Sequence, residues 1–349
     1  MSGGVDSSTS AALLLEQGYD VIGVTLKLWK QDCFSPNEDL FKCCGAKAAD
    51  DVRVVCNHLG IPFHLIDKAD EFQKKVISHF AAEYRAGRTP NPCILCNEHL
   101  KFGTLLRYAD QLGAQYVATG HYARVERVNG RTLLKRGRDP RKDQSYFLFS
   151  LRQDQLSRAL FPVGGQTKSD TRVAARQRQL KTAEKKESME ICFVPDNDYG
   201  KFLQQANLVQ KHRGEIVDLQ GRVLGHHDGI EFYTIGQRKG LGISSPKPLY
   251  VINLDAKNNR VVVGDDSALD RHEFTVERCN WIPFDDLSAP IEATVKIRYN
   301  HPGTPATVTP SGDGSAKVKL NAAQRAITPG QAAVFYQDDL VVGGGWIAR

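Results

Sequence analysis

The chain has 349 residues, a formal net charge of +6, and 41% hydrophobic and 25% charged residues, which is typical of globular proteins. Its apolar stretches, such as residues 11–15, are far shorter than the roughly 18 residues that span a membrane, and the N-terminus lacks the features of a secretory signal. We therefore expect a cytoplasmic protein of about two or three domains with no membrane contact.

Helix and strand patterns alternate from Asp6 to about Asn207. Gly18 and Gly60 follow two of the helical patterns and are expected to end them. In chain order the patterns predict a helix through residue 15, a strand at 21–26, a helix at 46–59, a strand at 63–66, helices at 72–84 and 98–108, and a strand at 116–119. Such alternation predicts a parallel sheet covered by helices on both faces.

The pattern changes at Gly214, where short strands with Gly, Pro and Asn turns begin. From about Arg271, alternating runs at 293–299, 316–320 and 332–336 are typical of a small antiparallel barrel. We therefore predict an α/β catalytic domain over 1–207, a small central domain over 208–270 and a C-terminal β-barrel over 271–349.

Residues 2–8, with the sequence Ser-Gly-Gly-Val-Asp-Ser-Ser, lead straight into the first helix. Two glycines let the backbone approach a ligand, and the amides that follow lie at a helix N-terminus, where an anion is stabilised. A glycine-serine turn that only caps a helix explains most short matches, but the full string favours phosphate binding. No Gly-Lys-Ser/Thr string occurs in the chain, which argues against transfer of a terminal phosphoryl group.

The carboxyl ends of the predicted parallel strands form the edge at which open sheets bind ligands. The strand at 21–26 is expected beside the phosphate loop, and Thr119, Gly120 and His121 follow another strand. Gly120 has no side chain and would let an adenosine lie against the backbone. His121, considered alone, is more often a packed loop histidine than a functional one.

Residues 124–142 hold eight Lys or Arg against Glu126 and Asp139, so this window has a net charge of 8 − 2 = +6. It equals the excess of the whole chain, whereas residues 271–349 hold eight Lys or Arg and eight Asp or Glu. Two interpretations stay open for this basic window: a solvated hairpin or a polyanion-binding surface.

Eight cysteines in a cytosolic chain favour thiol chemistry or metal binding over a disulfide framework. Cys93 and Cys96 follow two prolines, and we expect a helix to begin near Asn97, so that a rigid loop presents both thiols. The helix start and the basic window should lower a thiol pKa there. Cys192 offers a third thiol in an apolar context.

Three interpretations compete for the cysteines. Structural zinc held by Cys93 and Cys96 with Cys43 and Cys44 is disfavoured, because adjacent cysteines seldom ligate one tetrahedral ion. We expect inert buried thiols at Cys33, Cys56 and Cys279. For Cys93, Cys96 and Cys192 we prefer sulfur transfer, either by persulfide relay or on an iron-sulfur cluster with one open iron.

Six strings occur in order along the chain, at residues 2–8, 86–92, 118–122, 142–147, 191–193 and 236–242. Together they resemble the bacterial tRNA-specific 2-thiouridylases, members of the ATP pyrophosphatase superfamily, from end to end. The resemblance implies an adenine-nucleotide-hydrolase-like α/β domain, a small central domain and a β-barrel, which agrees with the pattern changes above.

The resemblance also implies roles for individual residues. ATP, accompanied by Mg²⁺, would be bound by Met1, Ser2, Gly3, Gly4, Val5, Asp6, Ser7, Leu26 and Gly120. The target base would face Asn91, Pro92 and Cys93. Transfer RNA would be contacted by His121, Lys142, Asp143, Gln144, Arg298, Tyr299 and Gln331.

The implied reaction begins with the wobble uridine leaving its stack. Its C2 oxygen attacks ATP, which gives an adenylated base and pyrophosphate; a persulfide on Cys192 then attacks C2, and Cys96 resolves the persulfide and leaves a disulfide. A cysteine desulfurase or a sulfur-relay protein would donate the sulfur. The alternative for the sulfur step is sulfide bound to a [4Fe-4S] cluster on Cys93, Cys96 and Cys192.

The sequence departs from the family at two places. Many members carry Asp where this chain has Cys93, and a set of three cysteines fits a [4Fe-4S] cluster better than the Asp version does. The family's first strand precedes the phosphate loop, whereas this chain starts at Met1, so we expect that strand to be missing from the sequence as given.

Two other functions compete with the family resemblance. A pyrophosphatase-type ligase that amidates a small acid would need neither Cys192 nor the barrel. A non-enzymatic RNA-binding module would leave the phosphate loop unexplained.

Overall fold

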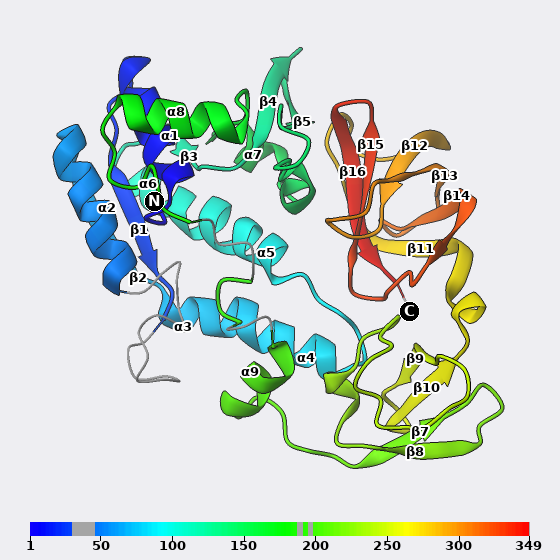
Figure 1. The fold of residues 1–349 in the computed structure, drawn as a ribbon. Coiled ribbons are helices and arrows are strands. Elements are labelled where there is room, and N and C mark those ends of the chain that lie inside the picture. Colours follow the sequence, from blue (N-terminus) through cyan, green and yellow to red (C-terminus); the bar gives the residue numbers. More distant parts are fainter. Residues whose placement is uncertain (30–45, 187–190, 195–197, 349) are drawn as a thin grey trace. The chain divides into compact units, whose positions relative to one another are not determined.

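The computed structural model describes residues 1–29, 46–186, 191–194 and 198–348 (Figure 1). Within these residues, no helix is long and apolar enough to cross a membrane.

Parallel strand pairs flanked by helices form the N-terminal part of the chain. Strand β1 (Gly23–Lys27) pairs in parallel with β2 (Phe63–Asp67), and helix α2 (Ala46–Leu59) packs against both. Strand β3 (Val117–Ala118) pairs in parallel with β6 (Ala159–Leu160). This arrangement confirms the predicted parallel α/β fold.

Helix α1 (Val5–Glu16) follows the phosphate loop and packs against α8 (Lys168–Gln177). Its apolar residues Ala11, Ala12 and Leu14 are buried. The helix ends before Gly18, which has φ +83°, a left-handed conformation that glycine adopts without a steric penalty.

Two long helices in this part each contain a π-helical segment. The first consists of α3 (Ala69–Phe72), the π-segment Gln73–Ile77 and α4 (Ser78–Arg85). The second consists of α5 (Pro92–Leu95), the π-segment Cys96–Thr104 and α6 (Leu105–Gln111). The second helix begins at Pro92 rather than near Asn97, because proline has no amide hydrogen and fits the first position of a helix.

The basic window forms a β-hairpin of β4 (Ala123–Val128) and β5 (Arg131–Arg136). Asn129 and Gly130 have φ of 49° and 78°, as the two-residue turn of a twisted hairpin requires. A 3₁₀-helix (Ser145–Leu148) and α7 (Gln153–Leu156) follow.

Helix α9 (Tyr199–Gln205) precedes a four-stranded sheet with the order β8 (Val223–His227), β7 (Gly214–Val217), β10 (Arg260–Gly264) and β9 (Tyr250–Asp255). Strands β7 and β10 are parallel, and the other neighbours are antiparallel. Two 3₁₀-helices, Ile230–Phe232 and Asp266–Leu269, complete this region. Val251, Val261 and Val263 lie in its buried core.

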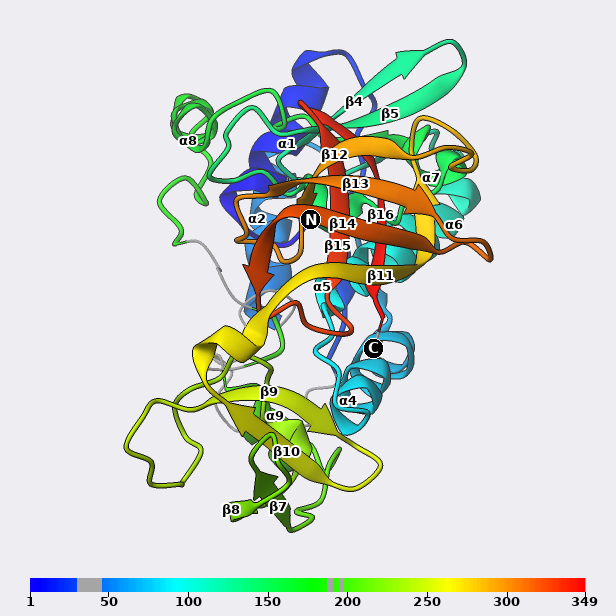
Figure 2. The ribbon, with the colours of Figure 1, turned by 90° about the vertical axis from the view of Figure 1, so that its right-hand side faces the viewer.

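The C-terminal strands form a closed antiparallel barrel, which confirms the prediction (Figure 2). Their order is β11 (Asp270–Trp281), β14 (Ala316–Arg325), β13 (Thr304–Pro310), β12 (Ile291–Lys296), β15 (Ala332–Gln337) and β16 (Leu340–Ile347), and β16 pairs with β11 to close the barrel. In β14, buried Ala316, Val318 and Leu320 alternate with exposed Lys317 and Lys319, as the strand period of two requires.

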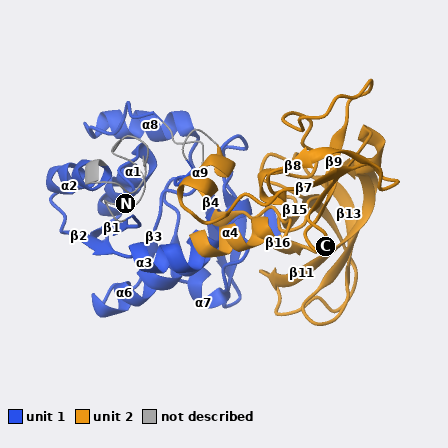
Figure 3. Cartoon of the chain, turned by 90° about the horizontal axis from the view of Figure 1, so that it is seen from below, with its two compact units in different colours: residues 1–76, 93–197, 339–341 blue, residues 77–92, 198–338, 342–349 orange. Residues whose placement is uncertain are grey.

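The chain divides into two compact units (Figure 3). The first unit holds residues 1–76, 93–197 and 339–341, and the second holds 77–92, 198–338 and 342–349. The domain boundaries after residues 207 and 270 stay a prediction.

Candidate active site

The phosphate loop ends in the open N-terminus of α1. The first hydrogen bond within the helix runs from the Ser8 amide to the Gly4 carbonyl, at 3.2 Å. The amides of residues 4–7 precede this bond and have no acceptor within the helix. The Ser7 hydroxyl accepts from the Ser2 amide at 3.2 Å and folds the loop over the helix end. The loop therefore presents amide donors and the positive end of a helix dipole to an anion.

Glycines at two positions let the backbone approach closely. A Cβ on Gly3, which has φ +69°, would lie 2.9 Å from the Ala48 carbonyl oxygen, and a Cβ on Gly120 would lie 2.7 Å from the Ser7 amide nitrogen. The structure thus brings Gly120 against the phosphate loop, and the predicted contact of Gly120 with adenosine stays a prediction. Strand β1, which carries Leu26, runs beside the loop, and the Thr25 hydroxyl donates to the Met1 carbonyl at 3.1 Å.

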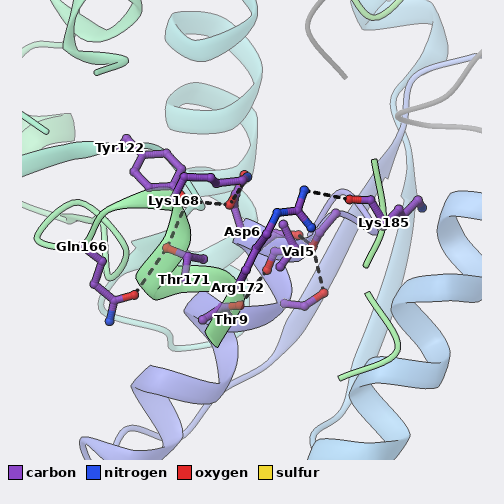
Figure 4. Close-up of polar contacts among 12 residues, drawn as sticks. Val5, Asp6, Thr9, Tyr122, Gln166, Lys168, Thr171, Arg172 and Lys185 are labelled. Carbon is purple, nitrogen blue, oxygen red and sulfur yellow. Dashed lines mark hydrogen bonds and ion pairs between the residues drawn. The ribbon is translucent and has the colours of Figure 1, made fainter. Parts of the chain in front are cut away.

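Lys168, which the sequence analysis did not identify, lies at the phosphate loop (Figure 4). Its ammonium donates to both carboxylate oxygens of Asp6, at 2.7 and 2.8 Å. The Tyr122 hydroxyl donates to Asp6 at 2.8 Å, and the Lys168 ammonium lies 5.5 Å from the centre of the Tyr122 ring. Lys168 is buried, so a charged group is held in place beside the anion-binding amides.

One local signal could have identified Lys168. Thr167 caps α8 and forms a capping box with Asp170, which makes Lys168 the first residue of that helix. A positive charge in the first turn of a helix is unfavourable, because it lies at the positive end of the helix dipole. A lysine at this position therefore indicates that another interaction stabilises it. Its partner Asp6 supplies one.

Cys93 and Cys96 lie inside a helix, not on a loop before one. Cys93 belongs to α5, Cys96 begins the π-segment, and both are partly exposed. Burial raises the pKa of the Cys96 thiol, and the nearby Lys101 lowers it less. The expectation of a lowered pKa is therefore wrong for Cys96, because desolvation of the thiolate outweighs the helix start.

Cys192 is partly exposed and is followed by Phe193, a deeply buried anchor. The Phe193 ring lies 5.6 Å from the ring of Phe72 and 6.1 Å from that of Trp29. The stretch 191–194, which contains Cys192, is thus anchored in the first unit by the Phe193 ring. No group of three or more His, Cys, Asp or Glu side chains among the described residues could hold a metal ion.

The thiols expected to be inert have the environment of structural cysteines. Cys56 is fully buried in an apolar core, and burial raises its pKa. Burial also raises the pKa of Cys279, to about 12. Cys33, Cys43 and Cys44 lie outside the described residues.

Four predicted tRNA contacts lie in the first unit, and several of them have internal partners. Buried Asp143 accepts from the amides of Gly137 and Ser145, at 3.0 and 3.1 Å. The Gln144 side chain accepts from the Tyr122 amide at 3.1 Å, and Lys142 is partly exposed.

His121, the fourth of these residues, is only 8% exposed. It packs against Phe102 and Phe161, and its Nδ1 lies 2.6 Å from the Thr119 hydroxyl. Burial holds its pKa well below the ordinary value, so the imidazole is neutral at neutral pH. These are features of a packed loop histidine, and its contact with tRNA stays a prediction.

The other predicted RNA residues lie in the second unit. The Gln331 side chain donates to the Thr89 carbonyl at 2.9 Å, close in sequence to the predicted base-contacting residues Asn91 and Pro92. Arg298 is exposed, and the Lys296 ammonium lies 5.7 Å from the centre of the Tyr299 ring. Gln331 therefore supports the loop at Thr89, and its contact with tRNA stays a prediction.

Comparison with known families assigns three segments of the chain. Residues 1–196 match the tRNA methyl transferase HUP domain, residues 200–265 the tRNA methyl transferase PRC-barrel domain, and residues 271–347 the aminomethyltransferase beta-barrel domain.

Curated relatives match over almost the whole chain. The tRNA-specific 2-thiouridylase MnmA of Clostridium acetobutylicum is 48% identical over 347 residues, which cover 99% of this chain and 98% of the relative. Proteins of the same name from Heliobacterium modesticaldum and Geotalea uraniireducens are 51% and 49% identical, over 100% and 99% of this chain and 91% and 93% of the relatives.

Proposed function

Because the chain belongs to the MnmA family of tRNA-specific 2-thiouridylases, we propose that it is a tRNA-uridine 2-sulfurtransferase that uses ATP. The reaction adenylates the C2 oxygen of the wobble uridine and then replaces that oxygen with sulfur. The observation that carries this proposal is the open helix N-terminus at residues 2–8, in the same compact unit as Cys93, Cys96 and Cys192.

The phosphate loop performs the ATP half of the reaction. The uridine C2 oxygen attacks the α-phosphorus of ATP, and pyrophosphate leaves. Negative charge develops on the leaving group, where the amides of residues 4–7 and the helix dipole stabilise it. Gly120 lies against the phosphate loop, where a side chain would collide with the Ser7 amide, and Leu26 on β1 contributes to the adenosine pocket.

Lys168 adds a fixed positive charge to this site. Its ammonium is held by Asp6 and lies over the Tyr122 ring, so the cation needs no rearrangement when pyrophosphate charge develops. Both oxygens of Asp6 bond to Lys168, which leaves this carboxylate poorly placed to ligate Mg²⁺. Mg²⁺ enters the proposal as the counter-ion of the ATP phosphates.

Cys192 and Cys96 perform the sulfur half. The terminal sulfur of a Cys192 persulfide attacks C2 of the adenylated base, and AMP leaves. The Cys96 thiolate then attacks the Cys192 sulfur, which releases the thiolated base and forms a Cys96–Cys192 disulfide. A two-electron reductant regenerates both thiols, and a cysteine desulfurase or a relay protein reloads Cys192.

The alternative sulfur step places sulfide on a [4Fe-4S] cluster held by Cys93, Cys96 and Cys192. As they lie in the described structure, these three side chains do not form a metal-binding group. We therefore favour the persulfide relay and derive no step through a cluster. Cys93 is left as a neighbour of the target base, with Asn91 and Pro92.

An assay of ATP cleavage tests the proposal against its rivals. The purified chain is incubated with ATP, a persulfide donor and unmodified tRNA, and AMP and pyrophosphate are quantified with and without the tRNA. The proposal expects both products only when tRNA is present. Cleavage supported by a small carboxylic acid and ammonia would favour a ligase, and binding of tRNA without any cleavage would favour an RNA-binding module.

A further inference from the structure

Lys185 bonds to the phosphate loop from a segment far along the chain. Its ammonium donates to the Gly3 carbonyl at 2.9 Å and to the Asp51 carboxylate at 2.6 Å. Gly3 belongs to the phosphate loop and Asp51 to helix α2. Lys185 therefore joins the loop to a helix on its flank, and neither partner is close to it in sequence.

The bond to Gly3 fixes the direction of an amide that faces the anion. The Gly3 carbonyl and the Gly4 amide belong to one planar trans peptide, so they point in opposite directions. Gly3 has φ +69°, and glycine backbones rotate with little steric restraint. A donor that holds the Gly3 carbonyl therefore also holds the Gly4 amide, the first of the amides at the open helix end.

Lys185 is itself held by helix α8 (Figure 4). Arg172 donates to the carbonyl of Ala183 at 2.6 Å and to that of Lys185 at 3.2 Å. Arg172 lies four residues after Lys168, on the same side of α8. Helix α8 thus acts on the phosphate loop at two points: through Lys168 on Asp6, and through Arg172 and Lys185 on Gly3.

We propose that Lys185 is a positioning residue for the ATP phosphates, which acts by orienting the Gly3–Gly4 peptide. This inference rests on the proposed use of ATP. It assigns to Lys185 no contact with the substrate, and it predicts an effect on ATP that leaves tRNA binding unchanged. In this proposal the ion pair between Lys185 and Asp51 keeps the Lys185 ammonium at the Gly3 carbonyl.

The test compares Lys185→Met with Lys185→Arg and with Lys181→Met, a matched loss of charge on an exposed lysine of the same segment. For each variant we measure the equilibrium Kd for ATP, kcat and KM for tRNA-dependent pyrophosphate release, the Kd for tRNA and the melting temperature. We expect Lys185→Met to raise the Kd and KM for ATP and so to lower kcat/KM for ATP by about tenfold to a hundredfold, at or below the hundredfold or more that complete loss of an oriented donor costs. Lys185→Arg should recover most of that loss, and Lys181→Met should match the wild type.

Two results would overturn the inference. One is an unchanged Kd and KM for ATP in Lys185→Met. The other is a parallel loss of ATP binding, tRNA binding and melting temperature, which would make Lys185 only a structural residue. If Lys185→Met does not fold, the Asp51→Asn variant is tested in its place, because that change weakens the ion pair that holds the Lys185 ammonium but keeps the ammonium. A rise of a few fold in the Kd for ATP in Asp51→Asn supports the inference, and an unchanged Kd rejects the inference. Because the ATP Kd needs no turnover, a wild type that binds but does not cleave ATP rejects the proposed function and leaves this test intact.

Discussion

Burial of the Cys96 side chain determines the pKa of its thiol and therefore its reactivity. The Lys101 ammonium stabilises a thiolate, but the loss of solvent around the sulfur costs more, and the pKa rises. The resting thiol is therefore protonated at neutral pH. Since only the thiolate attacks the disulfide between Cys192 and the base, resolution by Cys96 should become faster as the pH increases.

Alkylation kinetics check this pH dependence. In a Cys93→Ser, Cys192→Ser background, the rate of Cys96 alkylation by iodoacetamide should increase with pH through the ordinary cysteine pKa of about 8.5 and still increase at about pH 9. The raised pKa moves the midpoint of the rate against pH upward. At any pH below that midpoint, the thiolate fraction of Cys96 is smaller than that of a free cysteine. A rate that levels off below pH 8 would contradict the burial argument.

Substitution of single cysteines separates reactive from structural thiols. Cys96→Ser and Cys192→Ser should each abolish formation of 2-thiouridine, whereas Cys279→Ser should retain it, since burial raises the Cys279 pKa to about 12. Nucleoside mass spectrometry of reacted tRNA measures the product. Turnover at the wild-type rate in either of the first two variants would remove that cysteine from the mechanism.

The sequence predicted the phosphate loop and Gly120 but missed Lys168 and Lys185. The first two stand in strings whose residue types and spacing are themselves informative. A single lysine carries no such pattern, and the partners Asp6 and Gly3 lie 162 and 182 residues away. Only the fold brings these residues together.

At the element scale, the π-segment after Cys96 has a specific support. Buried Gln155 donates to the carbonyls of Glu98 and Phe102, at 3.1 and 2.8 Å, inside the segment Cys96–Thr104. A π-helix has i→i+5 hydrogen bonds, is rare, and often lies at functional sites. The sequence predicts a helix here but not its early start, because two prolines, Pro90 and Pro92, are typical of a loop.

Removal of the Gln155 amide should weaken this element. Gln155→Leu removes the side-chain donor from both carbonyls and should lower the free energy of unfolding by about 2 kcal/mol. Chemical denaturation measures the change, and Gln177→Leu on the exposed side of α8 is the control. Equal stability of the two variants would show that Gln155 does not support the segment.

The basic hairpin is less charged toward solvent than its sequence suggests. Arg124 pairs with Asp339 at 2.7 Å, Lys135 pairs with Glu126 at 2.5 Å, and Arg136 lies 3.7 Å from Asp143. The hairpin itself was predictable from Asn129-Gly130, but these pairings were not, because Asp339 comes from the end of the chain. RNA binding by this hairpin stays a prediction.

Salt dependence tests the RNA role of the hairpin. Replacement of Arg136, Arg138 and Lys142 by Gln should reduce the slope of log K for tRNA against log salt by about 2, since Arg136 is already paired. ATP affinity should not change. Replacement of Arg53, Lys74 and Lys181 by Gln is the control, and an equal change of slope in both triple variants would mean that only net charge matters.

At the scale of the whole molecule, the order of folds along the chain could be predicted. Alternating helix and strand patterns gave the parallel α/β part, and alternating apolar residues gave the antiparallel barrel. Closure of the barrel depends on pairing between β11 and β16, such as Val276 with Ile347. A local sequence pattern cannot predict a contact between residues so far apart in the sequence. The parallel register of Thr25 with Leu65 likewise depends on the fold.

If one chain couples ATP cleavage to thiolation of tRNA, the amounts of AMP and 2-thiouridine formed must be in a fixed ratio, and measuring that ratio tests the coupling directly. Unmodified tRNA is incubated with the chain, ATP, a persulfide donor and a reductant, and 2-thiouridine and AMP are quantified from the same sample. We expect about one 2-thiouridine for each AMP, with both products absent when tRNA is omitted and 2-thiouridine absent in Cys192→Ser. AMP released without any thiolated nucleoside in the wild type, or 2-thiouridine formed at the wild-type level by Cys192→Ser, would contradict it.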